Sequence, residues 1–370
     1  MRVLALEPYH GGSHRAFLEG FARESRHDLT VLGLPPRSWK WRMRHAAVTF
    51  ARAPEVRERH DVVLATSMLD LAPWRGLAPA SAARLPVLLY FHENQLTYPA
   101  RHDRERDLHF AYTHFTSCLA ADAIAFNSAF HRDAFLEALE GFLGRMPDHR
   151  HRDELAGIRE RATVIPPGCD PIEPGPARPP DRPLTILWAA RWEHDKNPED
   201  FFAALRILAA RGVPFRLNVI GESFHERPAI FEEARAEFAD RIDTWGFRET
   251  REEYLDVLRA SDVVVSTATH EFFGISVVEA VLAGCVPLLP DRLAYPEVLD
   301  VEEHPGRRTF LHDGSVEDLA NRLESSLDSP VSDIADLRAD LARRFGWATV
   351  APRLDAALER VASLRDDTPA

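Results

Sequence analysis

The stretch that decides the fold is HEFFGISVVEA, residues 270–280. It follows an apolar, β-branched run at residues 262–267, which predicts a buried parallel strand. A helical pattern begins near Gly274 and continues to about residue 284. A loop that carries Glu271 therefore leaves a strand end and enters a helix. The free amides and the positive dipole end of that helix suit an anion such as a diphosphate.

Two carboxylates accompany this helix start. Glu271 is expected in the loop, and Glu279 about a turn and a half into the helix. They can flank one anion and accept hydrogen bonds from sugar hydroxyls. Because the chain contains 58 acidic residues, the alternative for the spacing alone is a solvated helix face.

Composition restricts the class of protein. A length of 370 residues predicts two domains. Three widely spaced cysteines argue against a disulfide framework or a zinc site and fit a reducing cytosol. The chain enters a strand at once, so we expect no signal peptide, and no apolar run approaches the ~18 residues of a membrane span. We expect a cytoplasmic protein without a membrane partner. The net charge of −13 disfavours non-specific nucleic-acid binding but allows a local basic patch.

Two loops of the first half follow predicted strands. Residues 2–6 predict a strand that leads into a glycine loop, where backbone at Gly11 and Gly12 could approach a phosphate or sugar; a plain tight turn is the alternative. Residues 86–91 predict another strand, which ends in His92-Glu93-Asn94-Gln95. The carboxyl ends of strands are where α/β sheets bind ligands, so we predict a site role for His92.

Residues 37–45 combine basic and aromatic side chains. Arg37, Lys40, Arg42 and Arg44 alternate with Trp39 and Trp41. This pattern suits an anionic partner that can stack, such as RNA. The alternative is an amphipathic helix with buried tryptophans and solvated arginines.

The second half repeats the alternation of strands and helices. A proline-rich stretch at 173–182 predicts a linker between a domain at 1–172 and a domain at 183–346. Arg191 and Lys196 follow the first strand of the second domain and could clamp a diphosphate. We expect both side chains to lie at a strand end and to contribute nothing to the core; two merely exposed cations are the alternative.

The chain as a whole resembles the retaining GT-B glycosyltransferases, through Arg191, Lys196, the Glu271–Glu279 element and the Gly346-Trp347 break before a last helix. The resemblance implies an α/β fold of two Rossmann-like doubly wound domains facing across a cleft. A C-terminal helix, about 348–370, would cross back to the N-terminal domain. EPYHGGSH at 7–14, WKWR at 39–42 and FHENQLTYP at 91–99 resemble, more narrowly, the glycosyltransferase-like-domain-containing family of tRNA-queuosine mannosyltransferases.

This narrower resemblance implies an activity. Mannose would pass from GDP-mannose to the cyclopentenediol of queuosine in tRNA-Asp, with retention by front-face attack and the departing phosphate as base. The first domain would bind the acceptor, and the second the nucleotide sugar. No Asp-x-Asp pair occurs, so neither a metal nor another cofactor is expected.

The resemblance also implies site residues. The catalytic set is His92, Arg191, Lys196 and Glu271, and the donor-binding set is Gly11, Gly12, Gly221, Phe247, Phe272, Phe273, Gly274, Ile275, Ser276 and Glu279. The backbone amides after Glu271 would meet sugar and phosphate. The acceptor-binding set is His14, Trp39, Lys40, Trp41, Arg42, Arg44, Glu93, Asn94 and Gln95.

Two other functions stay open at this point. The same fold could act on a lipid, glycan or small-molecule acceptor, and the 37–45 stretch could then lie on a membrane surface. A non-catalytic sugar-nucleotide-binding module is disfavoured, because both glutamates, both cations and His92 are present.

Overall fold

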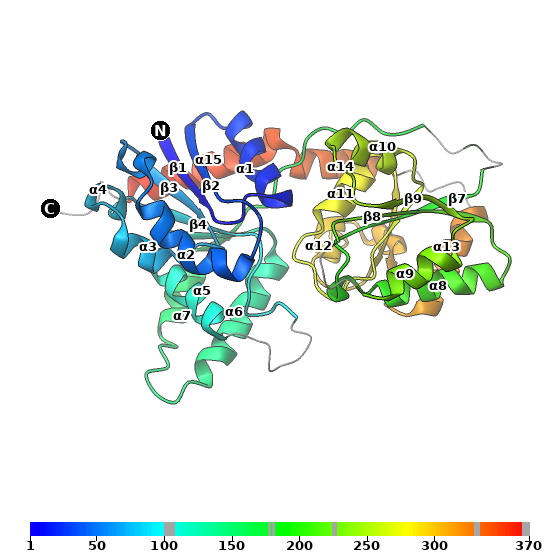
Figure 1. Ribbon diagram of the computed structural model, residues 1–370, viewed down its shortest axis with the longest axis horizontal. Coiled ribbons are helices and arrows are strands. Elements are labelled where there is room, and N and C mark those ends of the chain that lie inside the picture. Colours follow the sequence, from blue (N-terminus) through cyan, green and yellow to red (C-terminus); the bar gives the residue numbers. More distant parts are fainter. Residues whose placement is uncertain (100–107, 177–178, 180–181, 224–227, 329–333, 365–370) are drawn as a thin grey trace. The chain divides into compact units, whose positions relative to one another are not determined.

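The computed structural model describes residues 1–99, 108–176, 179, 182–223, 228–328 and 334–364 (Figure 1). Internal contacts divide the chain into two units. Unit 1 contains Met1–Asp170 and the chain from Phe345 onward, and unit 2 contains Pro171–Arg344. Within the predicted linker, 177, 178, 180 and 181 lie outside the described residues, as do 365–370 of the predicted last helix.

Unit 1 is built on a six-stranded sheet in the order β2-β1-β3-β4-β5-β6, with every pairing parallel. The strands are β1 (Arg2–Glu7), β2 (Asp28–Gly33), β3 (Val62–Thr66), β4 (Val87–Phe91), β5 (Ala123–Phe126) and β6 (Ala162–Val164). The helices are α1 (Gly12–Glu24), α2 (Trp39–Ala51), α3 (Leu71–Leu77), α4 (Ala80–Ala83), α5 (Leu108–Ala120), α6 (Ala129–Gly144) and α7 (Glu154–Arg161). Since β1 and β4 both flank β3, the residues that follow them meet at one edge of the sheet.

Alternate residues of each strand enter different layers of the core. Leu4 and Leu6 pack on the face that carries α2, α3, α5 and α6, whereas Val3 and Ala5 face α1 and the last helix, α15 (Trp347–Ser363). Both faces are buried, as expected for apolar strands of a parallel sheet.

The return of α15 to unit 1 depends on Trp347. A Cβ atom added to Gly20 or to Gly168 would lie 2.3 Å from the Trp347 ring, so only glycine fits at these two positions. The indole therefore fixes α15 against α1 and against the end of the first chain segment. The predicted return of the C-terminal helix to the first domain is confirmed.

Unit 2 contains the second parallel sheet, in the order β12-β11-β10-β7-β8-β9. Its strands are β7 (Leu184–Ala189), β8 (Phe215–Ile220), β9 (Ile242–Gly246), β10 (Val263–Val265), β11 (Val286–Pro290) and β12 (Leu311–His312). Its helices are α8 (Pro198–Ala210), α9 (Ile230–Glu237), α10 (Arg251–Arg259), α11 (Ile275–Leu282), α12 (Tyr295–Leu299), α13 (Val316–Asp328) and α14 (Ala335–Phe345). The predicted pair of doubly wound sheets is thus confirmed.

An aromatic cluster fixes the loop that follows β7. The ring of Trp192 is buried and stacks on Phe231 at 4.3 Å between centroids, and it meets Trp245 edge-on. This packing anchors the loop between Arg191 and Lys196. None of the helices described is both long and apolar enough to cross a lipid bilayer.

Candidate functional site

The loop between β10 and α11 has the predicted form. Gly274 is the N-cap residue of α11 with φ of 85°, in the left-handed region that favours glycine. A Cβ there would also lie 3.0 Å from the ring of Tyr295. The first turn of α11 carries no acidic residue, so its amides and dipole present positive potential.

Glu271 uses part of that potential itself. Its Oε1 accepts hydrogen bonds from the backbone amides of Phe272 at 3.1 Å and Phe273 at 3.3 Å. The side chains of both phenylalanines are buried. The prediction that these two amides bind sugar and phosphate is therefore corrected: they hold the carboxylate of Glu271, and the amides of Ile275 and Ser276 remain as predicted contacts for an anion.

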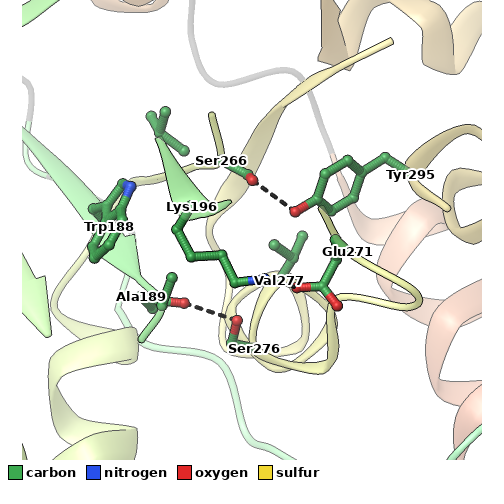
Figure 2. A pocket seen from close by; sticks show the side chains of 10 residues that line it. Trp188, Ala189, Lys196, Ser266, Glu271, Ser276, Val277 and Tyr295 are labelled. Carbon is green, nitrogen blue, oxygen red and sulfur yellow. Dashed lines mark hydrogen bonds and ion pairs between the residues drawn. The ribbon is translucent and has the colours of Figure 1, made fainter. Parts of the chain in front are cut away.

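Lys196 lies at the centre of the site in unit 2 (Figure 2). It ends the short 3-10 helix His194–Lys196, and its Nζ donates to the carbonyl of His270 at 2.7 Å. The same nitrogen forms ion pairs with Asp195 at 3.0 Å and with Glu271 at 3.3 Å. Lys196 is only 7% exposed, so the prediction that it contributes nothing to the core is wrong.

Opposite charges keep this pair ionised. Burial acts to lower the pKa of Lys196, but the carboxylates of Glu271 and Asp195 outweigh it and raise that pKa. Burial likewise acts to raise the pKa of Glu271, but the charge of Lys196 outweighs it and lowers that pKa. Glu271 is therefore ionised at neutral pH and acts as an acceptor of hydrogen bonds.

Arg191 is the more accessible of the two cations. Its side chain is 41% exposed and forms an ion pair with Glu193 at 3.4 Å. Its charge also lowers the pKa of Glu271, which places it in the same electrostatic environment as Lys196. The structure thus brings Lys196 into contact with Glu271, and the charge of Arg191 acts on the same carboxylate.

The second glutamate, Glu279, has partners that the sequence did not reveal. Its Oε1 accepts from Arg251 at 2.6 Å, and its Oε2 accepts from the Tyr254 hydroxyl at 2.9 Å. Both partners lie on α10, which begins with a capping box at Thr250. A ribose bound by Glu279 would therefore share the carboxylate with α10 or replace one of these contacts.

Three further residues that were predicted to bind the donor have different surroundings in the structure. A Cβ on Gly221 would lie 1.7 Å from the carbonyl oxygen of Ala190, so glycine permits the end of β8 to approach the loop after β7. The Ser276 hydroxyl donates to Ala189 at 2.8 Å and fastens α11 to β7 (Figure 2). Phe247 is 54% exposed and available to a ligand.

In unit 1, the predicted glycine loop enters α1. Gly11 is the N-cap residue of α1, and a Cβ there would lie 2.3 Å from Pro36. Gly12 has φ of 52° with open space around its Cα. Both glycines are therefore required by the backbone, and the first turn of α1 carries no acidic residue. This geometry supports an anion as well as a tight turn.

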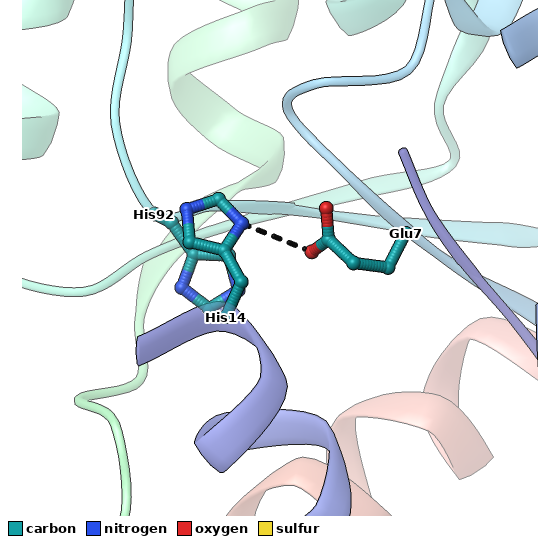
Figure 3. A group of neighbouring side chains, drawn as sticks. All are labelled: Glu7, His14 and His92. Atoms are coloured by element: carbon teal, nitrogen blue, oxygen red, sulfur yellow. Dashed lines mark hydrogen bonds and ion pairs between the residues drawn. The ribbon is translucent and has the colours of Figure 1, made fainter. Parts of the chain in front are cut away.

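His92 and His14 come together at the carboxyl edge of the unit 1 sheet (Figure 3). Their rings lie 4.1 Å apart, and His14 Nδ1 is 3.1 Å from Glu7 Oε2. Burial, followed by the charges of His14 and His131, holds the pKa of His92 well below its ordinary value. His92 is thus a neutral imidazole. Glu7 was not among the residues predicted from the sequence to lie at a site. An acidic residue at the end of an apolar strand could have indicated this position.

The loop after β4 contains a structural residue among the predicted ligands. Asn94 is fully buried, and its Oδ1 accepts from the amides of Leu96 at 3.0 Å and Thr97 at 2.9 Å. Its predicted contact with the acceptor is therefore corrected: Asn94 shapes the loop. Gln95 donates to the Glu93 carboxylate at 3.1 Å, and both remain partly exposed.

The basic helix α2 is also only partly as predicted. Arg42 is 8% exposed; it donates to the carbonyl of Pro35 at 3.0 Å and lies 2.8 Å from His45. Its predicted role in binding phosphate is corrected to a structural one. Lys40, Trp41 and Arg44 are exposed, and Trp39 packs partly buried on Phe110.

Two groups of side chains approach metal-ligand spacing in the part of the chain that the structure describes: Glu7, His14 and His92, and Asp300, His304 and Asp340. In the first group, His14 Nδ1 already lies 3.1 Å from Glu7 Oε2, and the two imidazole rings are tilted by 31° to each other. In the second group, Asp340 is already paired with Arg307 and Arg343.

The comparisons with known proteins agree with these two units. Residues 2–169 match the family model described as tRNA-queuosine alpha-mannosyltransferase N-terminal, and residues 172–345 match Glycosyl transferases group 1. Sucrose-phosphate synthase from Thermosynechococcus elongatus superposes with a TM-score of 0.75 at 16% identity, covering 98% of this chain and 100% of that chain. The Anabaena HepE complex with UDP and glucose gives 0.68 at 14% identity, covering 97% and 99%.

The two Rossmann-like units and the site after β7 and β10 thus define a glycosyltransferase with the GT-B fold. The tRNA-queuosine alpha-mannosyltransferase of Drosophila melanogaster is 36% identical over 311 residues, which is 81% of this chain and 82% of the relative. The chain belongs to the tRNA-queuosine alpha-mannosyltransferase family. A GDP-mannose:cellobiosyl-diphosphopolyprenol alpha-mannosyltransferase of Xanthomonas oryzae is 24% identical over 143 residues, 38% of this chain and 37% of the relative.

Proposed function

We propose that this protein transfers mannose from GDP-mannose to the cyclopentenediol of queuosine in tRNA-Asp, with retention at the anomeric carbon. The observation that carries the proposal is the 36% identity to the Drosophila enzyme across both units, because it includes the acceptor half as well as the donor half. The activity of the Drosophila relative supplies the acceptor, and that of the Xanthomonas relative supports GDP-mannose as donor.

The proposal assigns the donor to unit 2. Arg191, Lys196 and the first-turn amides of α11 would stabilise the negative charge that develops on the departing diphosphate. Ionised Glu271 would accept hydrogen bonds from the mannose hydroxyls, and Glu279 from the ribose. Lys196 and Glu271 are held by backbone groups and by their ion pair before any ligand binds, whereas Glu279 would share its carboxylate with α10 or exchange one of those contacts for the ribose.

The proposal assigns the acceptor to unit 1. His92 and His14 lie at the edge of the sheet where α/β folds bind ligands. Lys40, Arg44 and Trp41 on α2 would meet phosphates and bases of the tRNA, which is cytoplasmic in this proposal.

The test is to incubate the protein with isotopically labelled GDP-mannose and with tRNA that contains queuosine, and to digest the tRNA for nucleoside mass spectrometry. Labelled mannosyl-queuosine is expected, and tRNA with guanosine in place of queuosine is the matched control. Donor consumption without labelled tRNA would instead favour a small-molecule, glycan or lipid acceptor. Failure to bind GDP-mannose would count against both of these transferase functions.

Excess EDTA should leave the rate of transfer unchanged. We propose that fixed cations and a helix start stabilise the diphosphate, since Lys196 pairs with Glu271, the charge of Arg191 acts on the same carboxylate, and no Asp-x-Asp pair is available to hold a bridging metal. The measurement is the initial rate with and without EDTA after removal of free metal. Complete loss that manganese restores would contradict this mechanism.

A further inference from the structure

The hydroxyl groups of Ser266 and Tyr295 form a buried pair in the unit 2 site (Figure 2). Their oxygens lie 2.6 Å apart, and the two residues are only 8% and 2% exposed. Ser266 follows β10, and Tyr295 begins α12 after the neighbouring strand β11. The pair therefore lies at the carboxyl edge of the unit 2 sheet, where Lys196 and Glu271 line the same pocket.

This hydroxyl pair carries one more proton than it can use internally. Each hydroxyl has one proton, and only one of the two protons can lie between the oxygens. Ser266 Oγ also accepts from the amide of Ala268 at 3.2 Å, a contact that uses a lone pair and no hydroxyl proton. Within the residues that the structure describes, neither hydroxyl donates to any other group. Because a buried donor without an acceptor is costly, one O–H group is available to a molecule in the pocket.

The Tyr295 ring is fixed against the turn that opens α11. A Cβ added to Gly274 would lie 3.0 Å from this ring and 3.6 Å from Cγ of Glu271, so the ring and the glutamate side chain flank the same turn. Burial, followed by the charge of Glu271, raises the pKa of Tyr295, so the hydroxyl keeps its proton at neutral pH. The pair is thus a preorganised donor beside an ionised acceptor.

These two walls of the pocket match a sugar hydroxyl. An ionised carboxylate only accepts hydrogen bonds, whereas the Ser266–Tyr295 pair offers a proton. A sugar hydroxyl can donate to the carboxylate and accept from the pair at the same time. The diphosphate has no proton to donate to Glu271, and its charge is matched by Lys196 and by the first-turn amides of α11. The pair is therefore suited to the hexose of the donor and not to its diphosphate.

We propose that the Ser266–Tyr295 pair determines specificity for the donor sugar by donating one hydrogen bond to a hydroxyl oxygen of the hexose held at Glu271. The inference rests on the proposed function for the identity of that hexose as mannose. All of the contacts that it uses come from unit 2. A site that hydrogen-bonds a substrate hydroxyl strongly rejects analogues that lack this hydroxyl.

The double variant Ser266→Ala/Tyr295→Phe removes both protons, so the test does not depend on which hydroxyl donates. The phenylalanine keeps the ring against Gly274. Isothermal titration with GDP and with GDP-mannose separates the sugar from the nucleotide. The Kd of GDP-mannose should rise about tenfold, for one lost hydrogen bond, and the Kd of GDP should stay native. A merely structural role of the pair would change both Kd values.

The matched control is Ser261→Ala. Ser261 precedes β10 at the end opposite Ser266, and its buried hydroxyl donates to the carbonyl of Val257 at 2.7 Å. This variant should have a lower melting temperature and native Kd values for both ligands. In the double variant, a native Kd for GDP-mannose, or an equal rise in both Kd values, would overturn the inference.

The two single variants, Ser266→Ala and Tyr295→Phe, apply the same test if the double variant does not fold. At least one of them must weaken GDP-mannose binding without weakening GDP binding, because one of the two hydroxyls donates to the sugar. Native binding of GDP-mannose by both single variants would overturn the inference.

The outcomes separate this inference from the proposed function. If the native protein binds a UDP-hexose in preference to GDP-mannose, the proposed donor is wrong. The variants are then titrated with that UDP-hexose and with UDP. A selective loss of UDP-hexose binding would support the role of the pair in reading the sugar, and equal effects on both ligands would overturn it.

Discussion

Replacing Lys196 with alanine should lower kcat about 100- to 1000-fold, the effect of one lost charge-stabilising donor at a developing anion. The same change should also destabilise the protein. Lys196 Nζ holds the carbonyl of His270 and the carboxylates of Asp195 and Glu271. Removing one partner of a buried ion pair costs about 3–5 kcal/mol. Because a quarter of the Glu271 side chain is exposed, we expect the lower end of that range.

Steady-state kinetics with GDP-mannose and equilibrium unfolding in urea measure the two effects separately. Lys196→Met/Glu271→Gln removes both charges of the pair and should recover part of the stability without recovering turnover. Arg191→Ala is the control for charge alone: its side chain is 41% exposed, so turnover should fall while the urea midpoint stays near the native value. A Lys196→Ala protein with native kcat would refute the assignment.

The part of the site in unit 2 could be predicted because its signals are local in sequence. The β-branched run of β10, Gly274 and the apolar periodicity of α11 specify a strand, a turn and a helix within about twenty residues. Arg191 and Lys196 follow a similarly clear strand, β7. In a parallel sheet, neighbouring strands bring such loops to one edge, so the meeting of Lys196 with Glu271 follows from the topology.

The direction of a side chain could not be predicted in the same way. Arg42 and Arg44 look equivalent in the sequence, but α2 packs Met43 against Met68 and Phe110, and this contact rotates Arg42 inward. Asn94 and Gln95 are also alike in polarity, and only the turn shows that the Asn94 amide binds backbone. The pairing of Glu7 with His14 depends on the glycine loop between them, whose conformation the residue types leave open.

The exposed surface of α2 is where we expect substitutions to have a large effect on tRNA binding. Arg37, Lys40 and Arg44 are exposed, and the Arg44 guanidinium lies 4.7 Å from the centre of the Phe110 ring, which orients it. Trp41 is 62% exposed. With a net charge of −13, the protein can hold RNA only where cations are segregated, and α2 offers cations beside the exposed ring of Trp41.

Reversing Arg37, Lys40 and Arg44 together to glutamate should therefore abolish transfer to tRNA and leave GDP-mannose binding intact. Each phosphate contact contributes about one unit to the slope of log K against log salt, so the slope for tRNA should become shallower by about three. Arg42 is kept native, because its buried guanidinium supports the fold.

The control reverses Arg206, Arg211 and Arg216 of unit 2, which changes the net charge equally at exposed ion pairs and should preserve tRNA affinity. If the α2 variant still mannosylates tRNA at the native rate and with the native salt slope, the RNA surface lies elsewhere on the protein. In that case Trp41→Ala should also be silent, whereas a stacked base would lose about 1–3 kcal/mol of binding.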